Sequence, residues 1–147
     1  MEIYYYTFTG NCRKIAEILA AEFKGELREI RSFKLPYILW LILSFIPNLG
    51  VKINTQPPCS SEIVLCFPKW TLNCPPVTAF LRKYAEGRNI KMIICFGGFD
   101  EKRYAEFYRK FALKCGALTA DTMLVKRRDL KENKEDVKSK LINFLKS

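Results

Sequence analysis

The 147-residue sequence contains no histidine. Histidine is the usual general base at neutral pH and a common zinc ligand, so its absence excludes Ser-His-Asp hydrolysis, His-ligated zinc and histidine phosphorelay. The six cysteines form no Cys-x-x-Cys pair, which argues against a zinc or iron–sulfur site. Most of them lie in apolar runs such as IVLCF and IICF, as is typical of reduced cysteines in a protein core. We therefore expect no metal site and a cytoplasmic protein.

Acidic residues are in the minority, because 25 Lys and Arg oppose 15 Asp and Glu and leave a net charge of +10. This charge predicts a negatively charged partner, such as an acidic redox protein, an anionic membrane or a phosphorylated cofactor. The basic residues are spread along the chain, with one short cluster at 126–128, and this spread does not favour nucleic-acid binding. The chain opens directly with a strand pattern, so we expect no signal peptide.

The hydrophobic content of 49% is enough to fill the core of one domain over residues 1–147. Along the chain, short β-rich runs alternate with segments of helical periodicity. Such alternation predicts an α/β fold in three layers, with a parallel sheet of about five strands and helices on both faces. We expect strands at 2–8, 26–33, 61–68, 91–98 and 117–127, and helices at 11–23, 75–87, 104–116 and 135–147.

One apolar segment, Leu35–Gly50, interrupts this alternation after the second strand. It is too short for a transmembrane helix, which needs roughly 20 apolar residues. One interpretation is a very hydrophobic helix packed on the sheet. The other is a surface that docks on a membrane or a partner protein, because Trp40 and Phe45 would be costly to leave in water.

The loop after the first strand, Thr7–Cys12, offers two hydroxyls, a glycine and a side-chain amide at the start of a helix. A helix N-terminus presents unpaired N–H groups and a positive dipole end, which together bind phosphate. The alternative is an ordinary helix cap formed by Thr9 or Asn11. The sequence has neither the GxxxxGK[ST] loop of nucleotide triphosphatases nor the GxGxxG loop of dinucleotide-binding proteins.

The residues TFTGN, starting at Thr7, resemble the [ST]-x-T-G-N phosphate loop of flavodoxin-like proteins, which holds the FMN phosphate. Cys12 departs from that pattern, which usually has a third hydroxyl there, and a thiol is a poorer donor. FPKWTLNCPPVTAFL resembles the P-x-W…P-x-x-x-x-F-L stretch that lies along the flavin in short members of the family. The paired glycines after the strand ending at Phe96 would let backbone amides approach a ring edge.

The resemblance covers essentially the whole chain and implies a flavodoxin-like fold that binds FMN. Trp70 would stack on the flavin ring, although a tryptophan at a loop can also be part of the core. The implied cofactor contacts are Thr7, Phe8, Thr9, Gly10, Asn11, Cys12, Pro68, Lys69, Trp70, Thr71, Asn73, Phe96, Gly97 and Gly98.

The implied function is that of an FMN-binding redox protein, which carries electrons or reduces a small acceptor such as a quinone or flavin. Its electron partner would be an acidic or iron–sulfur protein. We assign no catalytic residue; as an enzyme the protein would be an FMN-dependent oxidoreductase. The alternative is a non-catalytic binding module that kept the fold, lost FMN and docks an acidic partner or a membrane surface.

Overall fold

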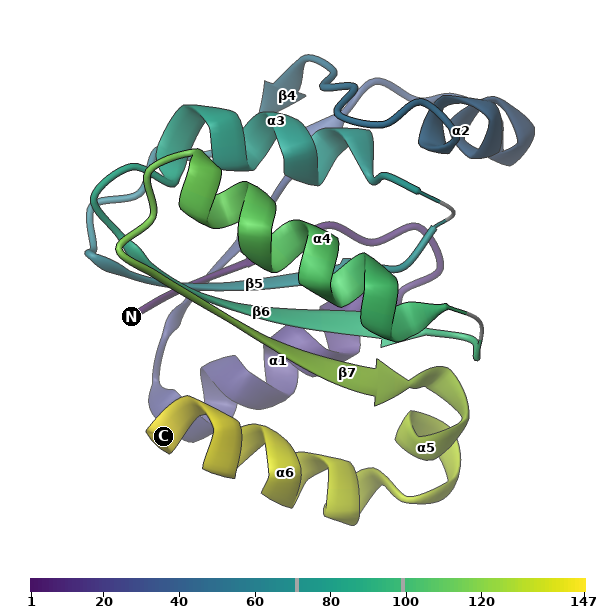
Figure 1. The fold of residues 1–147 in the computed structure, drawn as a ribbon. Helices are drawn as coiled ribbons and strands as arrows, with labels where there is room; N and C mark the ends of the chain where they lie inside the picture. Colours follow the sequence, from purple (N-terminus) through teal and green to yellow (C-terminus); the bar gives the residue numbers. More distant parts are fainter. Residues whose placement is uncertain (71, 99) are drawn as a thin grey trace.

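A five-stranded parallel sheet lies between two layers of helices in the computed structural model of the protein (Figure 1). The structure describes residues 1–70, 72–98 and 100–147. The strand order is β2-β1-β5-β6-β7, so the chain reverses its direction of travel across the sheet beside β1. The strands are β1 (Glu2–Tyr5), β2 (Glu26–Glu29), β5 (Glu62–Pro68), β6 (Asn89–Phe96) and β7 (Thr119–Lys126). The predicted α/β fold with a parallel sheet of five strands is confirmed.

Successive side chains of each central strand point to opposite faces of the sheet and fill two separate cores. In β5, Ile63, Leu65 and Phe67 belong to one core, and Val64 and Cys66 belong to the other. Helices α3 (Pro75–Tyr84) and α4 (Glu101–Lys114) cover the first core, and α1 (Asn11–Phe23) and α6 (Lys134–Lys146) cover the second (Figure 1). Burial on both faces explains why β5 reads as a continuous apolar run.

Four of the five predicted strands end earlier than expected, because the first ends at Tyr5, the second at Glu29, the fourth at Phe96 and the fifth at Lys126. The strand predicted over 26–33 leaves the sheet at Ile30, whose N–H makes the last bond to Tyr5 O. It continues as β3 (Arg31–Ser32), which pairs antiparallel with β4 (Ile53–Asn54) in a separate two-stranded ribbon. The strand predicted over 117–127 ends at Lys126, where the short helix α5 (Arg127–Glu132) begins. Sequence periodicity marks the apolar residues but does not show where main-chain pairing stops.

Helix α2 (Tyr37–Ser44) lies within the apolar segment 35–50 and does not pack along the sheet. The sheet face on its side is already covered by α3 and α4, and α2 projects beyond them (Figure 1). Trp40 and Ser44 are buried, but most of the other side chains of this helix are half-buried or exposed. Among the described residues, no helix is both long and apolar enough to cross a membrane.

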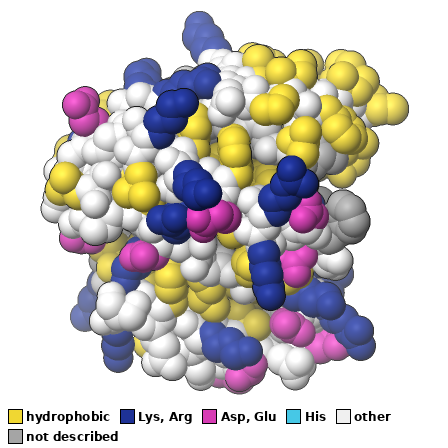
Figure 2. Space-filling view, viewed as in Figure 1, with side chains coloured by type: hydrophobic (Ala, Val, Ile, Leu, Met, Phe, Trp, Pro, Cys, Tyr) yellow, Lys and Arg dark blue, Asp and Glu magenta, His cyan; other side chains and the backbone are white. Residues whose placement is uncertain are grey.

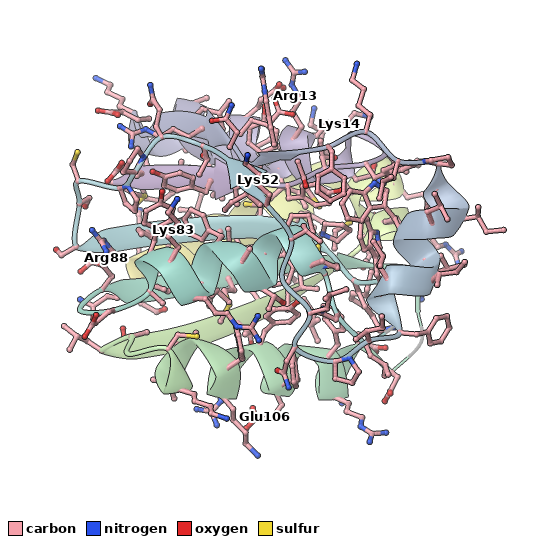
Figure 3. All side chains as sticks on the ribbon, turned by 90° about the horizontal axis from the view of Figure 1, so that it is seen from above. Arg13, Lys14, Lys52, Lys83, Arg88 and Glu106 are labelled. Carbon is pink, nitrogen blue, oxygen red and sulfur yellow. The ribbon has the colours of Figure 1, made fainter. Side chains whose placement is uncertain are left out.

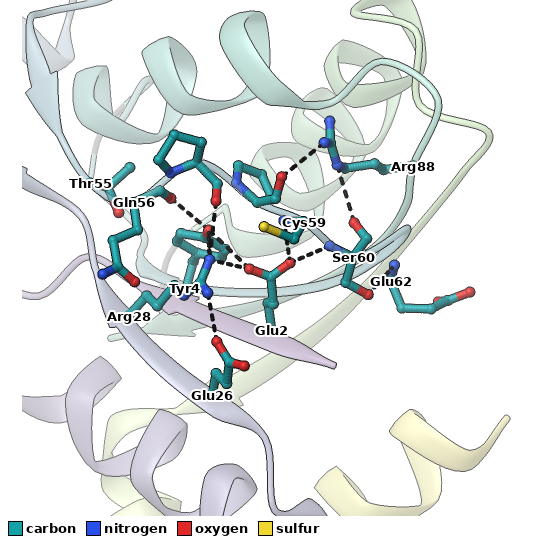
Figure 4. A network of polar contacts seen from close by, with 12 residues as sticks. Glu2, Tyr4, Glu26, Arg28, Thr55, Gln56, Cys59, Ser60, Glu62 and Arg88 are labelled. Atoms are coloured by element: carbon teal, nitrogen blue, oxygen red, sulfur yellow. Dashed lines mark hydrogen bonds and ion pairs between the residues drawn. The ribbon is translucent and has the colours of Figure 1, made fainter.

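The amino end of the sheet is closed by a network of polar contacts around Glu2 (Figure 4). One carboxylate oxygen, Oε1, accepts hydrogen bonds from the N–H groups of Cys59 (2.7 Å) and Ser60. The other oxygen accepts one from Arg28, which also donates to the Tyr4 hydroxyl at 3.0 Å. Burial alone would raise the pKa of Glu2, but the two N–H groups and Arg28 outweigh burial and hold this pKa below its ordinary value.

Candidate cofactor site

A cleft of about 190 Å³ opens at the carboxyl ends of β1, β5 and β6. This is the edge of an open parallel sheet at which ligands bind, next to the strand where the chain reverses direction. Most of the side chains predicted from the first and second loops meet here: Thr7, Phe8, Thr9, Asn11, Cys12, Pro68, Lys69 and Trp70. Four further residues line the cleft that were not among the predicted contacts: Tyr37, Leu41, Cys95 and Arg127.

The first loop turns tightly into α1 and leaves the end of that helix open. The N–H of Gly10 donates to Thr7 Oγ1 at 2.8 Å, and Gly10 adopts a φ of 95°, a conformation that favours glycine. The Asn11 amide donates to Thr9 Oγ1 at 3.3 Å. Within the described part of the chain, no side chain caps the first turn of α1. The ordinary helix cap is therefore not formed, and the N–H groups of the first turn remain available.

Cys12 contributes its backbone to this loop, because its side chain is only 2% exposed and packs in the core with Cys66 and Cys95. Burial is the main cause that raises the pKa of the Cys12 thiol well above its ordinary value, and a hydrogen bond with Cys95 adds to the effect. The thiol therefore stays protonated and lies toward Cys95. Flavodoxin-like phosphate loops usually have a third hydroxyl at the position of Cys12. The Cys12 thiol does not take the place of that hydroxyl as a hydrogen-bond donor to a phosphate.

In the second loop, Trp70 lies between the cleft and the core. The indole lines the cleft but is only 8% exposed. Its ring centroid is 5.6 Å from that of Tyr6, edge to face, and 5.7 Å from that of Trp40. The Lys69 ammonium donates to Trp70 O at 3.1 Å and lies 5.8 Å from the centre of the Tyr104 ring. Trp70 thus presents one part of its surface to a ligand, while its aromatic neighbours hold the rest.

Asn73 is a predicted contact that the structure places in the core and not in the lining of the cleft. The residue is fully buried, and its amide donates to Ile46 O (3.1 Å) and Leu49 O (2.8 Å). Its oxygen accepts hydrogen bonds from Tyr108 (2.9 Å) and Thr78. Because the whole amide is engaged within the protein, Asn73 has a structural role, which is to hold the chain after α2 against α3 and α4. Thr71, also predicted as a contact, lies outside the described residues.

Among the described residues, the third loop does not line the cleft itself but lies against Arg127, which does. Arg127 was not among the contacts predicted from the sequence. Phe96, Gly97 and Gly98 lie beside the cleft but do not line it. A Cβ atom built on Gly97 would overlap the guanidinium of Arg127, so the absent side chain makes room for that group. In the sequence, Arg127 stands in a basic cluster at the end of a strand, and nothing local separates it from Arg128. In the structure, Arg127 lines the cleft beside Gly97, whereas Arg128 pairs with Glu132.

Several solved structures share this architecture. A flavoprotein from Lactobacillus acidophilus, solved in complex with FMN, is 20% identical, with a TM-score of 0.62 over 90% of this chain and 95% of that one. A putative flavoprotein from Bacteroides uniformis is 12% identical, with a TM-score of 0.67 over 92% and 96%. A short-chain flavodoxin associated with a bacterial microcompartment is 14% identical, with a TM-score of 0.51 over 99% and 95%. The chain therefore has a flavodoxin-like fold.

A relative of much higher identity comes from an archaeon. An uncharacterized protein of Archaeoglobus fulgidus is 65% identical over 146 residues, which cover 99% of each chain. The chain belongs to the same family as that protein. No family model matches the sequence.

Proposed function

We propose that the protein binds FMN in this cleft and acts as a redox protein, carrying electrons or reducing a small acceptor of the quinone or flavin type. The observation that carries this proposal is the uncapped first turn of α1 behind the TFTGN loop, at the carboxyl end of β1. A flavodoxin-like neighbour of known structure was solved with FMN, which supports the choice of cofactor.

The donors around the first loop fit a phosphate group. The first N–H groups of α1 have no intrahelical partner, and the helix dipole adds a partial positive charge. The lining of the cleft also includes Thr7 and Thr9, which have hydroxyls, and Arg127, which has a guanidinium. Among the described residues that line the cleft, none is acidic, so an anion meets no like charge there.

The apolar side of the cleft fits an aromatic ring system. Phe8, Tyr37 and Trp70 line it, and the rings of Phe8 and Tyr37 lie 5.3 Å apart. The cleft alone is smaller than the roughly 300–1,000 Å³ of most cofactor pockets. A neighbouring groove that also includes Thr7 and Phe8 extends it toward Phe33 and Trp40. Phe33 and Trp40 add aromatic surface to this groove, which is also lined by Glu29, Arg31 and Lys34.

FMN, when bound, supplies one- and two-electron transfer that amino-acid side chains lack. The residues of this chain orient the ligand and exclude water from one side of it. Among the described residues, the lining of the cleft itself contains no carboxylate or imidazole that could act as a general acid or base, and the neighbouring groove contains one carboxylate, Glu29. This composition suits electron transfer better than a reaction that requires the protein to move protons. An acidic redox protein is the partner that the positive charge of the chain favours. An iron–sulfur protein is the other partner that the resemblance to flavodoxin-like proteins implies.

Thr9→Val tests the position of the phosphate. Thr9 is the better choice of the two hydroxyls, because Thr7 also accepts the Gly10 N–H and its loss would alter the turn. We expect the variant to weaken FMN binding by about 1–3 kcal/mol, measured by the change in FMN fluorescence on titration. The control is Thr119→Val, which removes an exposed hydroxyl at the amino end of β7.

Two results would contradict the proposal. Unchanged FMN affinity in Thr9→Val would show that the phosphate lies elsewhere. A parent protein that is purified colourless and does not bind added FMN would instead favour the alternative, a binding module without the cofactor.

A further inference from the structure

The surface around α2 is strongly apolar. Figure 2 shows hydrophobic side chains gathered at the upper right of the molecule, over the position of α2 in Figure 1. Each of the large apolar side chains that make up this patch, on α2 and just after it, is at least 42% exposed: Tyr37, Ile38, Leu39, Ile42, Phe45 and Ile46. We call these six residues the α2 patch. Soluble surfaces rarely group so many large apolar side chains without a partner.

Contacts on either side of the α2 patch fix its position on the protein surface. Trp40, on the opposite side of the helix, is 2% exposed and packs against Tyr6, Phe33 and Trp70. After the helix, the buried Asn73 amide binds the carbonyl oxygens at 46 and 49. These anchors leave the patch as a preformed surface.

The charges near the patch indicate that its partner is negatively charged. Residues 35–51 contain no charged side chain, and the exposed residues Lys34 and Lys52 bound them. Lys34 lines the groove beside Trp40, together with Arg31, which forms an ion pair with Glu29 in the same groove. Seen from above, Lys52 lies nearer the middle of the molecule, to one side of α2, which lies at the edge (Figure 3). A second copy of this chain would bring these cations and two charges of +10 together, which opposes self-association.

We propose that the α2 patch docks on the surface of an anionic lipid bilayer. The eight residues of α2 extend only about 12 Å, so the helix would lie in the interface and not cross the membrane. Its apolar side chains enter the boundary of the acyl chains, and Lys34 and Lys52 contact the negative headgroups. The apolar side chains of the patch suit the acyl chains of such a bilayer, and the lysines that flank the segment suit its anionic headgroups.

Docking would bring the mouth of the candidate cofactor site to the bilayer, because Tyr37 of the patch also lines the cleft and contacts Phe8 there. The cleft would then face acceptors dissolved in the membrane, such as lipid-soluble quinones. That consequence rests on the proposed function, whereas the docking itself does not. The test below contains no FMN, so its result is independent of cofactor binding.

The experiment is cosedimentation of the full chain with vesicles of phosphatidylcholine mixed with phosphatidylglycerol, compared with vesicles of phosphatidylcholine alone. We expect clear preference for the anionic vesicles. Ile38→Glu/Ile42→Glu should reduce binding by roughly a hundredfold or more, because two isoleucines can no longer enter the bilayer. Lys34→Gln/Lys52→Gln should reduce it on the order of thirtyfold, at about 1 kcal/mol per basic residue.

Matched controls carry the same changes elsewhere. Leu113→Glu/Leu118→Glu alters two exposed leucines, one in the last turn of α4 and one just before β7. Lys131→Gln/Lys134→Gln alters two exposed lysines in α5 and α6. Both controls should bind like the parent. Circular dichroism and thermal unfolding check that every variant is folded, which we expect because all eight positions are at the surface.

Three results would overturn the proposal. The first is a parent protein that binds neither kind of vesicle while remaining monomeric, which would leave an acidic protein as the occupant of the patch. The second is a dimer in vesicle-free buffer that Ile38→Glu/Ile42→Glu dissociates, which would make a second copy the occupant. The third is equal vesicle binding by the parent and by both sets of patch variants.

Discussion

The two ends of the parallel sheet are built from the same strands but use their polar groups differently. At the amino end, Glu2 is almost fully buried and accepts hydrogen bonds from two backbone N–H groups and from Arg28. At the carboxyl end, within the described residues, the first turn of α1 has no side-chain cap, and hydroxyls and a guanidinium face a cleft. Groups satisfied inside the protein stabilise the fold, whereas groups left open are available to a ligand. The comparison predicts that changes at the amino end affect stability and that changes at the carboxyl end affect binding.

The largest effect is expected at the amino end, for Glu2→Gln. The change removes the negative charge that two N–H groups and Arg28 surround, and it leaves the guanidinium without its buried partner. Breaking such a pair should lower the free energy of unfolding by about 3 kcal/mol, measured by urea denaturation. Glu26→Gln is the control, because Glu26 pairs with the same Arg28 but its side chain is 69% exposed. An exposed pair contributes at most about 1 kcal/mol.

The same residue predicts a dependence of stability on pH. Because the pKa of Glu2 is lower in the folded protein than its ordinary value of 4.5, its ionised form stabilises the fold. That contribution is complete above pH 4.5 and is lost as the pH falls through the folded pKa. The free energy of unfolding of the parent should therefore fall more steeply in acid than that of Glu2→Gln. Parallel curves for the two proteins would remove Glu2 as a source of acid sensitivity.

An intermediate effect is expected for Asn73→Ala, which tests whether Asn73 belongs with the structural groups. Removing the amide takes away the side-chain donor to two backbone carbonyls and one of the partners of the Tyr108 hydroxyl, which should cost about 2 kcal/mol of unfolding free energy. Hydrogen exchange of the amides at 45–50 should become faster, while FMN affinity should stay near that of the parent. Asn89→Ala, which removes an amide that bonds the exposed Glu62 side chain, is the control. If the variant instead lost FMN binding while its free energy of unfolding stayed unchanged, Asn73 would be a cofactor contact and not a structural residue.

The smallest effect is expected for Arg127→Gln, at the carboxyl end. Arg127 lines the cleft and is exposed, so solvent weakens its attraction for a phosphate to about 1 kcal/mol, or roughly a fivefold loss of FMN affinity. The loss should be larger at low salt. Arg128→Gln is the control, since Arg128 pairs with Glu132 on the surface. Gly97→Ala should reproduce the effect, because it displaces the Arg127 guanidinium. Equal affinities in all three variants would place Arg127 outside the site.

Much of the site depends on local sequence and could be predicted from it. Apolar residues with strand periodicity and with helical periodicity alternate along the chain, and this alternation identified all five strands of the main sheet. The order of a strand, the TFTGN loop and a helix brings Thr7, Thr9 and Asn11 to one edge of the sheet. Parallel strands meet at their carboxyl ends, so Pro68 and Trp70 had to lie near that loop as well. These features need only the order of residues and the geometry of a parallel sheet.

The remaining features arise from contacts between residues far apart in the sequence. Asn73 is engaged by carbonyls 24 and 27 residues before it and by a hydroxyl 35 residues after it, so its loop position gave no sign of a structural role. Arg127 differs from Arg128 through its place in the cleft beside Gly97, 30 residues before it in the sequence. The sequence shows that α2 is apolar, but whether its side chains are buried was decided by α3 and α4, which already cover the sheet face that α2 would otherwise occupy. Local order determines which elements form; competition for the same buried surface determines which side chains remain at the surface.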